Sequence, residues 1–288
     1  MTTKKQSLSL TESFIDTTAK IHPSAKIAND VVIGPWVYIG EKVEIGSGTR
    51  IDSHAVIMQH TIMGKNNHIH SHAVVGGDPQ DLSYRGEETW LKIGDGNIIR
   101  EFVTINRGSA GGIGTTTIGN RNCFLSYSHV AHDAHIGNDV LFINNATIAG
   151  HVVVDDFAII GAYATAHQFT RIGSYSFLVH ATQVSHDIPP FMLVKGTPGI
   201  PIALNLVGLR RRGFSVETIS GLKKAYRLMY RQRLSLKEVQ AALAALVAET
   251  PEIQLIIDLM KESKRGIVRK QVRSGSGSVD GDAREVMR

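Results

Sequence analysis

The sequence predicts a mainly β protein, in which a parallel β-helix built from hexapeptide repeats precedes a small C-terminal α-helical domain. An aliphatic residue recurs at every sixth position from Ile21 to Val75, returns in phase after a gap, and restarts at Ile118 to run as far as Val184. Isoleucine, valine or leucine occupies 21 of the 25 positions in this series. Helical spacing replaces the period from about residue 191.

A repeat of six residues fits neither the 3.6-residue period of a helix nor the simple alternation of an isolated strand. It is typical of parallel β-helices, in which each hexad supplies one short strand and one turn, and three hexads close a triangular coil. Stretches such as IGPWVY and IGEKVE place glycine directly after the aliphatic residue. We expect glycine, asparagine and aspartate at the corners, because they tolerate the left-handed backbone of tight turns. A β-sandwich with ordinary alternation is the alternative.

The pattern divides the chain into four regions. We expect an N-terminal extension over residues 1–20, the β-helix over 21–190, the helical domain over 191–270 and a disordered, Gly/Ser-rich tail over 271–288. Two stretches that lack the aliphatic step, residues 76–92 and 108–115, are expected to protrude as loops. Long loops on a rigid scaffold often carry function, although a solvated surface loop is the simpler interpretation.

The C-terminal region carries helix signals and an excess of positive charge. Apolar residues recur at helical spacing over residues 215–233, Ser235 and Glu238 form a predicted capping box, and Pro251 suits the first turn of a further helix. Between residues 210 and 273, 15 lysines and arginines accompany 6 acidic residues. This segment is expected to attract an anionic partner, with a merely solvated helix face as the alternative.

Composition limits the class of protein further. The 288 residues include one cysteine, Cys123, so no internal disulfide forms and a reducing, cytoplasmic compartment is expected. No run of about 18 consecutive apolar residues occurs, so no transmembrane segment is expected. The net charge of +5 favours an anionic partner. The basic segment matches no nucleic-acid-reading motif, so nucleic acid is not the expected partner.

The chain holds 13 histidines, and the period brings several of them together. Residues one coil apart stack at roughly one strand spacing of 4.8 Å. His132, His151 and His167 are each separated by about one coil, so they are expected near one column, with His129 at the same edge and Asp133 beside His132. Three interpretations stay open: exposed turn residues, a zinc site shared by adjacent coils, and general-base catalysis. Exposed turns are also the expectation for His68, His70 and His72.

The motif SHVAHDAHIGN, followed by NNATIAGHV and AHQF, resembles the acyl-ACP:UDP-N-acetylglucosamine O-acyltransferases that begin lipid A biosynthesis. GDPQDL, INRGS, VDDFAIIG, DIPPF and NLVGLRRRGFS agree with that family in order and position, so the resemblance runs from about Ile21 to Arg269. It implies a left-handed β-helix, although the usual crossover rule predicts the other hand. It also implies a homotrimer with sites between subunits, the acidic acyl carrier protein and UDP-N-acetylglucosamine as partners, and no metal or redox cofactor.

The resemblance also implies roles for individual residues. His132 is expected to be the general base that deprotonates the glucosamine 3-hydroxyl, Asp133 to orient its imidazole, and Gly150 to offer its backbone N–H to the oxyanion. Further residues are expected to bind the nucleotide sugar, the thioester or the phosphates: Gln80, Asp81, His129, His151, His167, Gln168, Asn205, Arg211 and Arg212.

Three positions depart from the family pattern. Ser83 stands where many members have lysine, with Arg85 as a candidate replacement for the cation, and Val207 stands where some members have glutamate. His180 occupies the position at which the acyl-chain groove ends in this family, where glycine goes with the longest chains. Its ring is therefore expected to shorten the donor. One column of residues, spaced by one coil each, holds Ser126, Asn144, Ala162 and His180.

Other functions stay open beside this one. A related solenoid enzyme N-acylates a glucosamine but carries an additional N-terminal uridine-binding domain, whereas about twenty residues precede the first hexad here. An acyltransferase acting on an amino group of a related UDP-sugar is harder to separate by sequence. A non-catalytic β-helical scaffold would show no acyl transfer. Acyl-chain length and 3-hydroxylation of the donor are not determined by the sequence.

Overall fold

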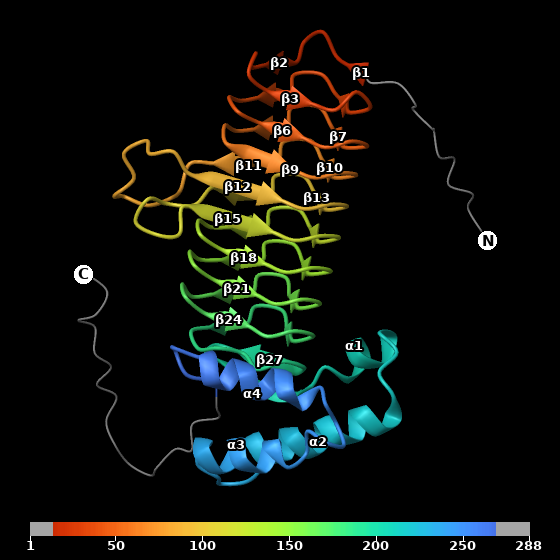
Figure 1. Cartoon of the computed structure of the whole chain (residues 1–288), viewed down its shortest axis with the longest axis vertical. Helices are drawn as coiled ribbons and strands as arrows, with labels where there is room; N and C mark the ends of the chain where they lie inside the picture. The colour runs from red at the N-terminus through yellow and green to blue at the C-terminus, as the bar shows by residue number, and fades with distance from the viewer. Residues whose placement is uncertain (1–13, 269–288) are drawn as a thin grey trace, which may run out of the picture.

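The chain coils into a left-handed parallel β-helix, a triangular prism whose C-terminal end is covered by helices (Figure 1). The computed structural model describes residues 14–268. Three parallel sheets, here called A, B and C, form the faces of the prism, and each coil contributes one short strand to each face. The predicted fold class is confirmed.

The strands of each sheet follow one another along the prism. Sheet A contains β1 (Phe14–Ile15), β4 (Val32–Ile33), β7 (Arg50–Ile51), β10 (His68–Ile69), β13 (Ile98–Ile99), β16 (Cys123–Phe124), β19 (Leu141–Phe142), β22 (Ile159–Ile160), β25 (Phe177–Leu178), β27 (Met192–Gly196) and β28 (Gly199–Leu204). Sheet B contains β2 (Lys20–Ile21), β5 (Tyr38–Ile39), β8 (Val56–Ile57), β11 (Val74–Gly77), β14 (Thr104–Asn106), β17 (His129–Val130), β20 (Thr147–Ile148), β23 (Thr165–Ala166) and β26 (Gln183–Val184). Sheet C contains β3 (Lys26–Ile27), β6 (Glu44–Ile45), β9 (Thr61–Met63), β12 (Trp90–Ile93), β15 (Thr115–Ile118), β18 (His135–Ile136), β21 (Val153–Val154) and β24 (Arg171–Ile172).

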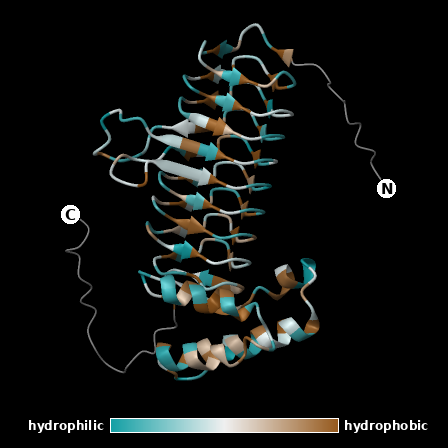
Figure 2. Cartoon of the chain, in the orientation of Figure 1, coloured by the Kyte–Doolittle hydropathy of each residue, from teal (hydrophilic) through white to brown (hydrophobic). Residues whose placement is uncertain are grey.

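The residue at each sixth position points into the prism, as its apolar character predicts. Ile33, Ile69 and Ile99 are 0% exposed. The residue before it faces outward, because successive side chains of a strand point to opposite faces. Ile98, beside Ile99, is accordingly 42% exposed. Hydrophobic residues recur on every coil in Figure 2, and this repeated burial holds the prism together.

Two insertions lengthen individual coils without disturbing the sheets. In a regular coil, Val56 pairs with Val74. In the next two coils of sheet B, Val74 pairs with Thr104 and Thr104 pairs with His129. The last two pairs are further apart along the chain than partners in a regular coil, so each of these coils contains extra residues. The extra residues form loops over residues 78–89 and 107–114, where loops over 76–92 and 108–115 were predicted; the first is shorter because β11 extends to Gly77 and β12 begins at Trp90. They leave the prism at the corner that joins sheet B to sheet C and project on the same side in Figure 1.

The composition of the corners differs from the prediction. The turn residue three positions after the buried aliphatic has a positive φ, as expected for a left-handed backbone. Rings and other large side chains occupy most of these positions instead of glycine, asparagine or aspartate, with Trp36, Tyr127 and Phe169 among them. Corner rings stack on those of the next coil, as Phe102 does on Tyr127 at 4.9 Å. Stacking between coils therefore offsets the backbone strain, which costs about 1–2 kcal/mol for an ordinary residue.

The ends of the β-helix also differ from the predicted boundaries. The strand series begins at Phe14, within the predicted extension of residues 1–20, because β1 pairs with β4. The predicted helical region, 191–270, opens with the antiparallel hairpin of β27 and β28, which continues sheet A. The predicted tail, 271–288, lies outside the described residues.

Four helices follow the hairpin in the described part of the chain: α1 (Leu206–Arg211), α2 (Val216–Tyr230), α3 (Leu236–Ala244) and α4 (Ile253–Glu262). The predicted capping box is present at α3, where Ser235 and Glu238 each accept a hydrogen bond from the other's backbone N–H. Helix α4 is tied to the prism by an ion pair between Glu262 and Arg171. Among residues 14–268, no helix combines the length and the apolar character needed to cross a bilayer.

The neighbours Ile98 and Ile99 test how the prism is stabilised. Ile99→Ala removes a fully buried side chain and is expected to lower the free energy of unfolding by about 2 to 5 kcal/mol. Ile98→Ala, on the outer face of the same strand, is the matched control, with a loss below about 1 kcal/mol. Denaturant unfolding of both variants measures the difference. Equal losses would contradict the inward orientation of the sixth-position residues.

Candidate active site

A buried carboxylate at the corner between sheets B and C accepts hydrogen bonds from several neighbouring groups. Asp133 is 3% exposed and adopts the left-handed corner conformation, with φ of 58°. Its Oδ2 accepts hydrogen bonds from Ser109 N at 3.0 Å, Ser109 Oγ at 2.7 Å and His132 Nδ1 at 2.8 Å. Its Oδ1 accepts from the backbone N–H groups of Ile113 and Gly114, both at 3.0 Å. Both oxygens are therefore saturated by fixed donors.

The loop of residues 107–114 exists in this shape because it wraps around Asp133. A Cβ added at Gly112 would lie 2.4 to 2.7 Å from the atoms of the Asp133 carboxylate, so only glycine fits. Burial alone would raise the pKa of the Asp133 carboxyl, but the hydrogen bonds from His132 and Ser109 outweigh it and lower that pKa. The carboxylate consequently stays ionised at neutral pH and fixes the imidazole of His132.

His132 presents its second ring nitrogen at the surface of the prism. Since Nδ1 donates to Asp133, Nε2 carries the free lone pair in the neutral ring. The ring lies against Gly150, where an added Cβ would meet Cε1 at 2.7 Å and Nε2 at 2.8 Å. Within residues 14–268 the Gly150 N–H donates to no protein acceptor. The arrangement thus places a free base and a free backbone donor close together.

Two further histidines flank His132. The His151 ring lies 5.3 Å from the His132 ring at 87°, and its Nε2 is 3.9 Å from Asp133 Oδ2. Burial and the nearby His132 lower the pKa of His151 against the opposing charges of Asp133 and Asp81. His129 pairs with Thr104 through Nδ1 at 2.7 Å, and burial, with a contribution from His132, lowers its pKa. Both imidazoles are therefore neutral at pH 7 and serve as hydrogen-bonding groups.

The predicted single column of histidines is wrong in detail. Relative to the buried residue of sheet B, His167 stands one position later, His132 two and His151 three, so their rings do not stack. His151 stacks on Phe169 instead, at 4.5 Å. His132, Asp133 and His151 do bring ligand atoms within 4.8 Å of one another, as a metal site requires. The hydrogen bonds already made to both oxygens of Asp133 favour a histidine–carboxylate dyad over zinc coordination.

The loop of residues 78–89 is anchored beside the dyad by a buried arginine. Arg107, 0% exposed, donates to Gly76 O and to Asp78 Oδ1, both at 2.6 Å, and to the Tyr84 hydroxyl at 3.0 Å. The loop carries Gln80, which is exposed, and Asp81, whose charge reaches His151. Of the predicted substrate-binding pair, Asp81 thus lies within electrostatic range of His132 and His151.

The departure in this loop, Ser83, and the candidate replacement for its cation, Arg85, both form hydrogen bonds within the loop. Ser83 hydrogen-bonds to Asp81 Oδ1 through its backbone N–H at 2.9 Å and its hydroxyl at 2.8 Å, and these bonds lower the pKa of Asp81. Arg85 donates to Leu82 O and Tyr84 O. The Arg85 guanidinium thus stabilises its own loop, and in this conformation it does not replace a cation at position 83.

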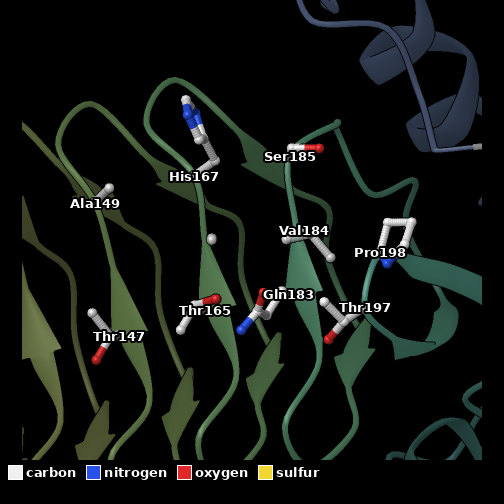
Figure 3. A pocket seen from close by; sticks show the side chains of 10 residues that line it. Thr147, Ala149, Thr165, His167, Gln183, Val184, Ser185, Thr197 and Pro198 are labelled. Atoms are coloured by element: carbon white, nitrogen blue, oxygen red, sulfur yellow. The ribbon is translucent and has the colours of Figure 1, made fainter. Parts of the chain in front are cut away.

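A groove of about 550 Å³ lies on the outer face of sheet B. Thr147, Thr165 and Gln183 occupy equivalent positions on successive strands, and Ala149, His167 and Ser185 follow those strands (Figure 3). Thr197 and Pro198 complete its C-terminal end. His167 and Gln168 are exposed, and His167 Nδ1 lies 3.2 Å from Gln168 O. Because His129 precedes Thr147 in the same register, the groove continues the line of sheet B away from the dyad.

Known proteins share this chain's sequence and fold. A family model described as UDP-N-acetylglucosamine O-acyltransferase, domain 2, matches residues 187–268, and one described as the GMPPB C-terminal domain matches residues 15–109. The acyl-[acyl-carrier-protein]–UDP-N-acetylglucosamine O-acyltransferase of Stenotrophomonas maltophilia is 47% identical over 208 residues, covering 72% of this chain and 79% of that protein. The chain belongs to this acyltransferase family.

Solved structures of UDP-N-acetylglucosamine acyltransferases share the fold of this chain. The Francisella novicida enzyme superposes with a TM-score of 0.88 at 38% identity, covering 90% of this chain and 95% of its own. The Moraxella catarrhalis enzyme superposes with a TM-score of 0.86 at 42% identity, covering 88% of this chain and 99% of its own. The agreement spans the prism and the C-terminal helices of this acyltransferase.

Four predicted site residues lie away from the dyad within one chain. Asn205 caps α1 by accepting from Gly208 N and donates to Tyr175 O at 2.9 Å, at the corner between sheets C and A. Arg212 lies over the Phe157 ring at 4.2 Å, at the same corner, and Arg211 is exposed nearby. His180 is exposed at the corner between sheets A and B, 5.7 Å from the Tyr163 ring. Val207 is 58% exposed on α1.

The sequence patterns missed the residues that support the site. Ser109 and Gly112 hold Asp133, and Arg107 holds the loop of residues 78–89. The motif INRGS includes Arg107 and Ser109, so the sequence marked these two residues but did not indicate what they contact. The glycine-rich stretch that follows is required by its contact with Asp133.

The neighbouring glycines Gly111 and Gly112 test the wrapping of the loop. Gly112→Ala is expected to push the loop off Asp133 and lower the free energy of unfolding by about 2 kcal/mol, as for lost hydrogen bonds to a charged group. Amide hydrogen exchange at Ile113 and Gly114 should accelerate. Gly111→Ala has open space around the new Cβ and should change neither measurement. Similar behaviour of the two variants would contradict the proposed contact.

Proposed function

We propose that the protein transfers an acyl chain from acyl carrier protein to the 3-hydroxyl of UDP-N-acetylglucosamine, the first step of lipid A biosynthesis. The observation that carries the proposal is the His132–Asp133 dyad set against the free N–H of Gly150. The names of the relatives agree with it. The single cysteine is consistent with action in the cytoplasm.

His132 would act as the general base. Its Nε2 takes the proton of the sugar hydroxyl while the hydroxyl oxygen attacks the thioester carbonyl carbon. Asp133 keeps the proton of the neutral ring on Nδ1 and stabilises the imidazolium that forms. Its lowered pKa suits this role, because a protonated carboxyl would lose that electrostatic support.

Gly150 would stabilise the tetrahedral intermediate. The backbone on both sides of Gly150 is fixed by hydrogen bonds between coils, so its free N–H donates to the oxyanion without reorganisation. Collapse of the intermediate breaks the carbon–sulfur bond, and the imidazolium returns its proton to the departing phosphopantetheine sulfur. Every step is acid–base or acyl transfer, so the proposed reaction calls for no metal or redox cofactor.

The remaining residues would bind the substrates. Gln80 and Asp81 approach from the loop of residues 78–89, and Asp81 accepts hydrogen bonds from sugar hydroxyls. The neutral imidazoles of His129 and His151 position the thioester and the sugar by hydrogen bonding. The acyl chain would follow the groove past His167 and Gln168, where the groove is lined by threonine, alanine and valine.

A homotrimer would complete this site. The groove is an open face of sheet B, whereas an acyl chain needs enclosure by apolar surface. Asn205, Arg211 and Arg212 lie at a different corner from His132, so they reach a substrate on the dyad only from a second copy of the chain. Sites between subunits would bring these corners together.

The helices would dock the acyl carrier protein. All of the basic side chains named here are exposed: Arg210, Arg211, Arg212, Lys223, Lys224, Arg227, Arg231 and Arg233. Among residues 14–268, Lys224 is the only one of these eight with an ion-pair partner, Glu249 at 3.7 Å. Unpaired cations on a rigid helical surface favour an acidic protein partner and a salt-dependent association.

A pair of nearby histidines tests the general base. His132→Ala should lower kcat by roughly 10² to 10⁴, as for loss of a general base. His135→Ala, on the outer face of sheet C, should keep near-normal turnover. Incubation with UDP-N-acetylglucosamine and hydroxyacyl carrier proteins, with the product identified by mass, gives the rates. Near-wild-type turnover by His132→Ala at saturating donor would show that the mechanism is wrong.

Donor length tests the proposed ruler. His180→Gly removes the ring at the end of the column with Ser126, Asn144 and Ala162, so preference should move toward longer acyl chains. Competition among carrier proteins bearing chains of several lengths measures that preference, with His135→Gly as the control. If the wild-type protein prefers the longest chain and His180→Gly leaves this unaltered, His180 is not the ruler.

A further inference from the structure

A second cluster of histidine and carboxylate groups lies on the outer face of sheet A, far along the chain from the dyad. Asp52 follows β7, His68 lies in β10 and His70 follows it. His68 and His70 were expected in exposed turns, but they stand two positions apart along one strand direction, where both side chains point to the same face. Asp52 comes from the adjacent coil, at the position equivalent to His70, because Ile51 pairs with Ile69.

The ligand-type atoms of this cluster lie close together. His68 Nε2 is 2.8 Å and His70 Nδ1 is 3.5 Å from Asp52 Oδ2, and all three atoms lie within 4.8 Å of one another. Ligands at about 2.0 to 2.2 Å from a tetrahedral zinc ion are about 3.3 to 3.6 Å apart, so rotation of the side chains that turns the two imidazole nitrogens toward Asp52 Oδ2 would admit the ion. The imidazole rings are stacked at 3.9 Å, which keeps both side chains on the same side of the strand.

We propose that Asp52, His68 and His70 form a zinc-binding site, with a fourth position open to water. Two imidazoles and one carboxylate are a donor set that zinc accepts, and this fourth position is left accessible because all three residues are partly exposed. The site is separate from the acyl-transfer dyad and does not depend on the proposed reaction.

The surroundings of the cluster support this assignment. Arg50 occupies the other carboxylate oxygen, Asp52 Oδ1, at 2.8 Å, which leaves Oδ2 directed at the two imidazoles. Glu101 Oε1 lies 3.6 Å from the same nitrogen, His70 Nδ1, and adds negative charge beside the proposed ligand atom. Glu101 in turn forms an ion pair with Arg100, whose Nε lies 2.9 Å from Glu101 Oε2.

Bound zinc would cross-link two adjacent coils. The backbone of both coils is fixed by the sheet, so the ligands are largely positioned before the ion arrives. Because the ion would bind the folded prism and not the unfolded chain, it would raise the thermal midpoint of unfolding as its concentration exceeds its dissociation constant. The expected role is structural.

The test uses the full chain, freed of metal by a chelator. Titration with zinc sulfate in a calorimeter should show saturable binding of one ion per chain, and cobalt(II) should give visible absorption bands typical of a tetrahedral site. The His68→Gln/His70→Gln variant should lose both signals and the zinc-dependent rise in midpoint. The matched control is His54→Gln/His72→Gln, which alters the stacked pair of rings at the neighbouring corner, 5.1 Å apart, and should keep all three.

A further variant separates this cluster from the dyad. His132→Gln disrupts the other set of ligand atoms and should leave zinc binding unchanged. Loss of binding in His132→Gln with retention in His68→Gln/His70→Gln would overturn the proposal, as would no saturable binding by the wild-type chain. If the double histidine variant fails to fold, Asp52→Asn, which removes the carboxylate ligand but retains both rings, should weaken zinc binding at least tenfold, and unchanged affinity would overturn it.

Discussion

Every coil of this protein must place its strands one strand spacing, about 4.8 Å, from those of the preceding coil, and the rest of the structure depends on that stacking. The strands are so short that the corners are the only places where the chain can depart from the ladder. Both insertions, the loops of residues 78–89 and 107–114, leave from the corner between sheets B and C. The polar site is therefore located where the regular backbone permits extra chain.

The same constraint explains the precision of the site. Asp133 sits at a corner whose backbone is fixed on both sides by parallel strands, and the loop of residues 107–114 closes over it with hydrogen bonds to both carboxylate oxygens. Two close approaches then specify glycine, at Gly112 against Asp133 and at Gly150 against His132. The His132 imidazole, its carboxylate partner and the Gly150 N–H are all held before any ligand binds, which is the condition for electrostatic preorganisation.

The sequence predicted the interior better than the corners, for a physical reason. The six-residue period reports burial, so positions such as Ile69 and Ile99 could be assigned from it directly. The corner side chains are instead selected by stacking on residues of the next coil, as Phe102 stacks on Tyr127, and this is not visible in a single repeat. His68 and His70 were wrongly predicted to lie in turns for a related reason. Positions only one or two residues apart in a hexad lie on a face or at a corner, and a single repeat does not show which.

The site was predictable only where a motif named its residues. The motif around His132 and Asp133 identified them as candidate site residues, and their side chains form a hydrogen bond in the structure. Ser109 and Arg107 act through a loop that follows no period, so their partners, Asp133 and Asp78, could not be derived from spacing. Asn205 and Arg212 lie at another corner because the hairpin and α1 continue from sheet A, which the linear sequence does not reveal.

The three sheets do not end together, and this protects the molecule from end-to-end association. Sheet C ends at β24, sheet B at β26 and sheet A at the β27–β28 hairpin. Beyond β24, Ile172 bridges to Ile188, and Asp187 bridges to Ile267 after the helices, so a segment from the far end of the domain occupies the place of a next strand. An open solenoid end presents a row of unpaired backbone groups on which another chain could add a coil. The staggered, occupied end of this prism instead opposes growth into end-to-end fibres.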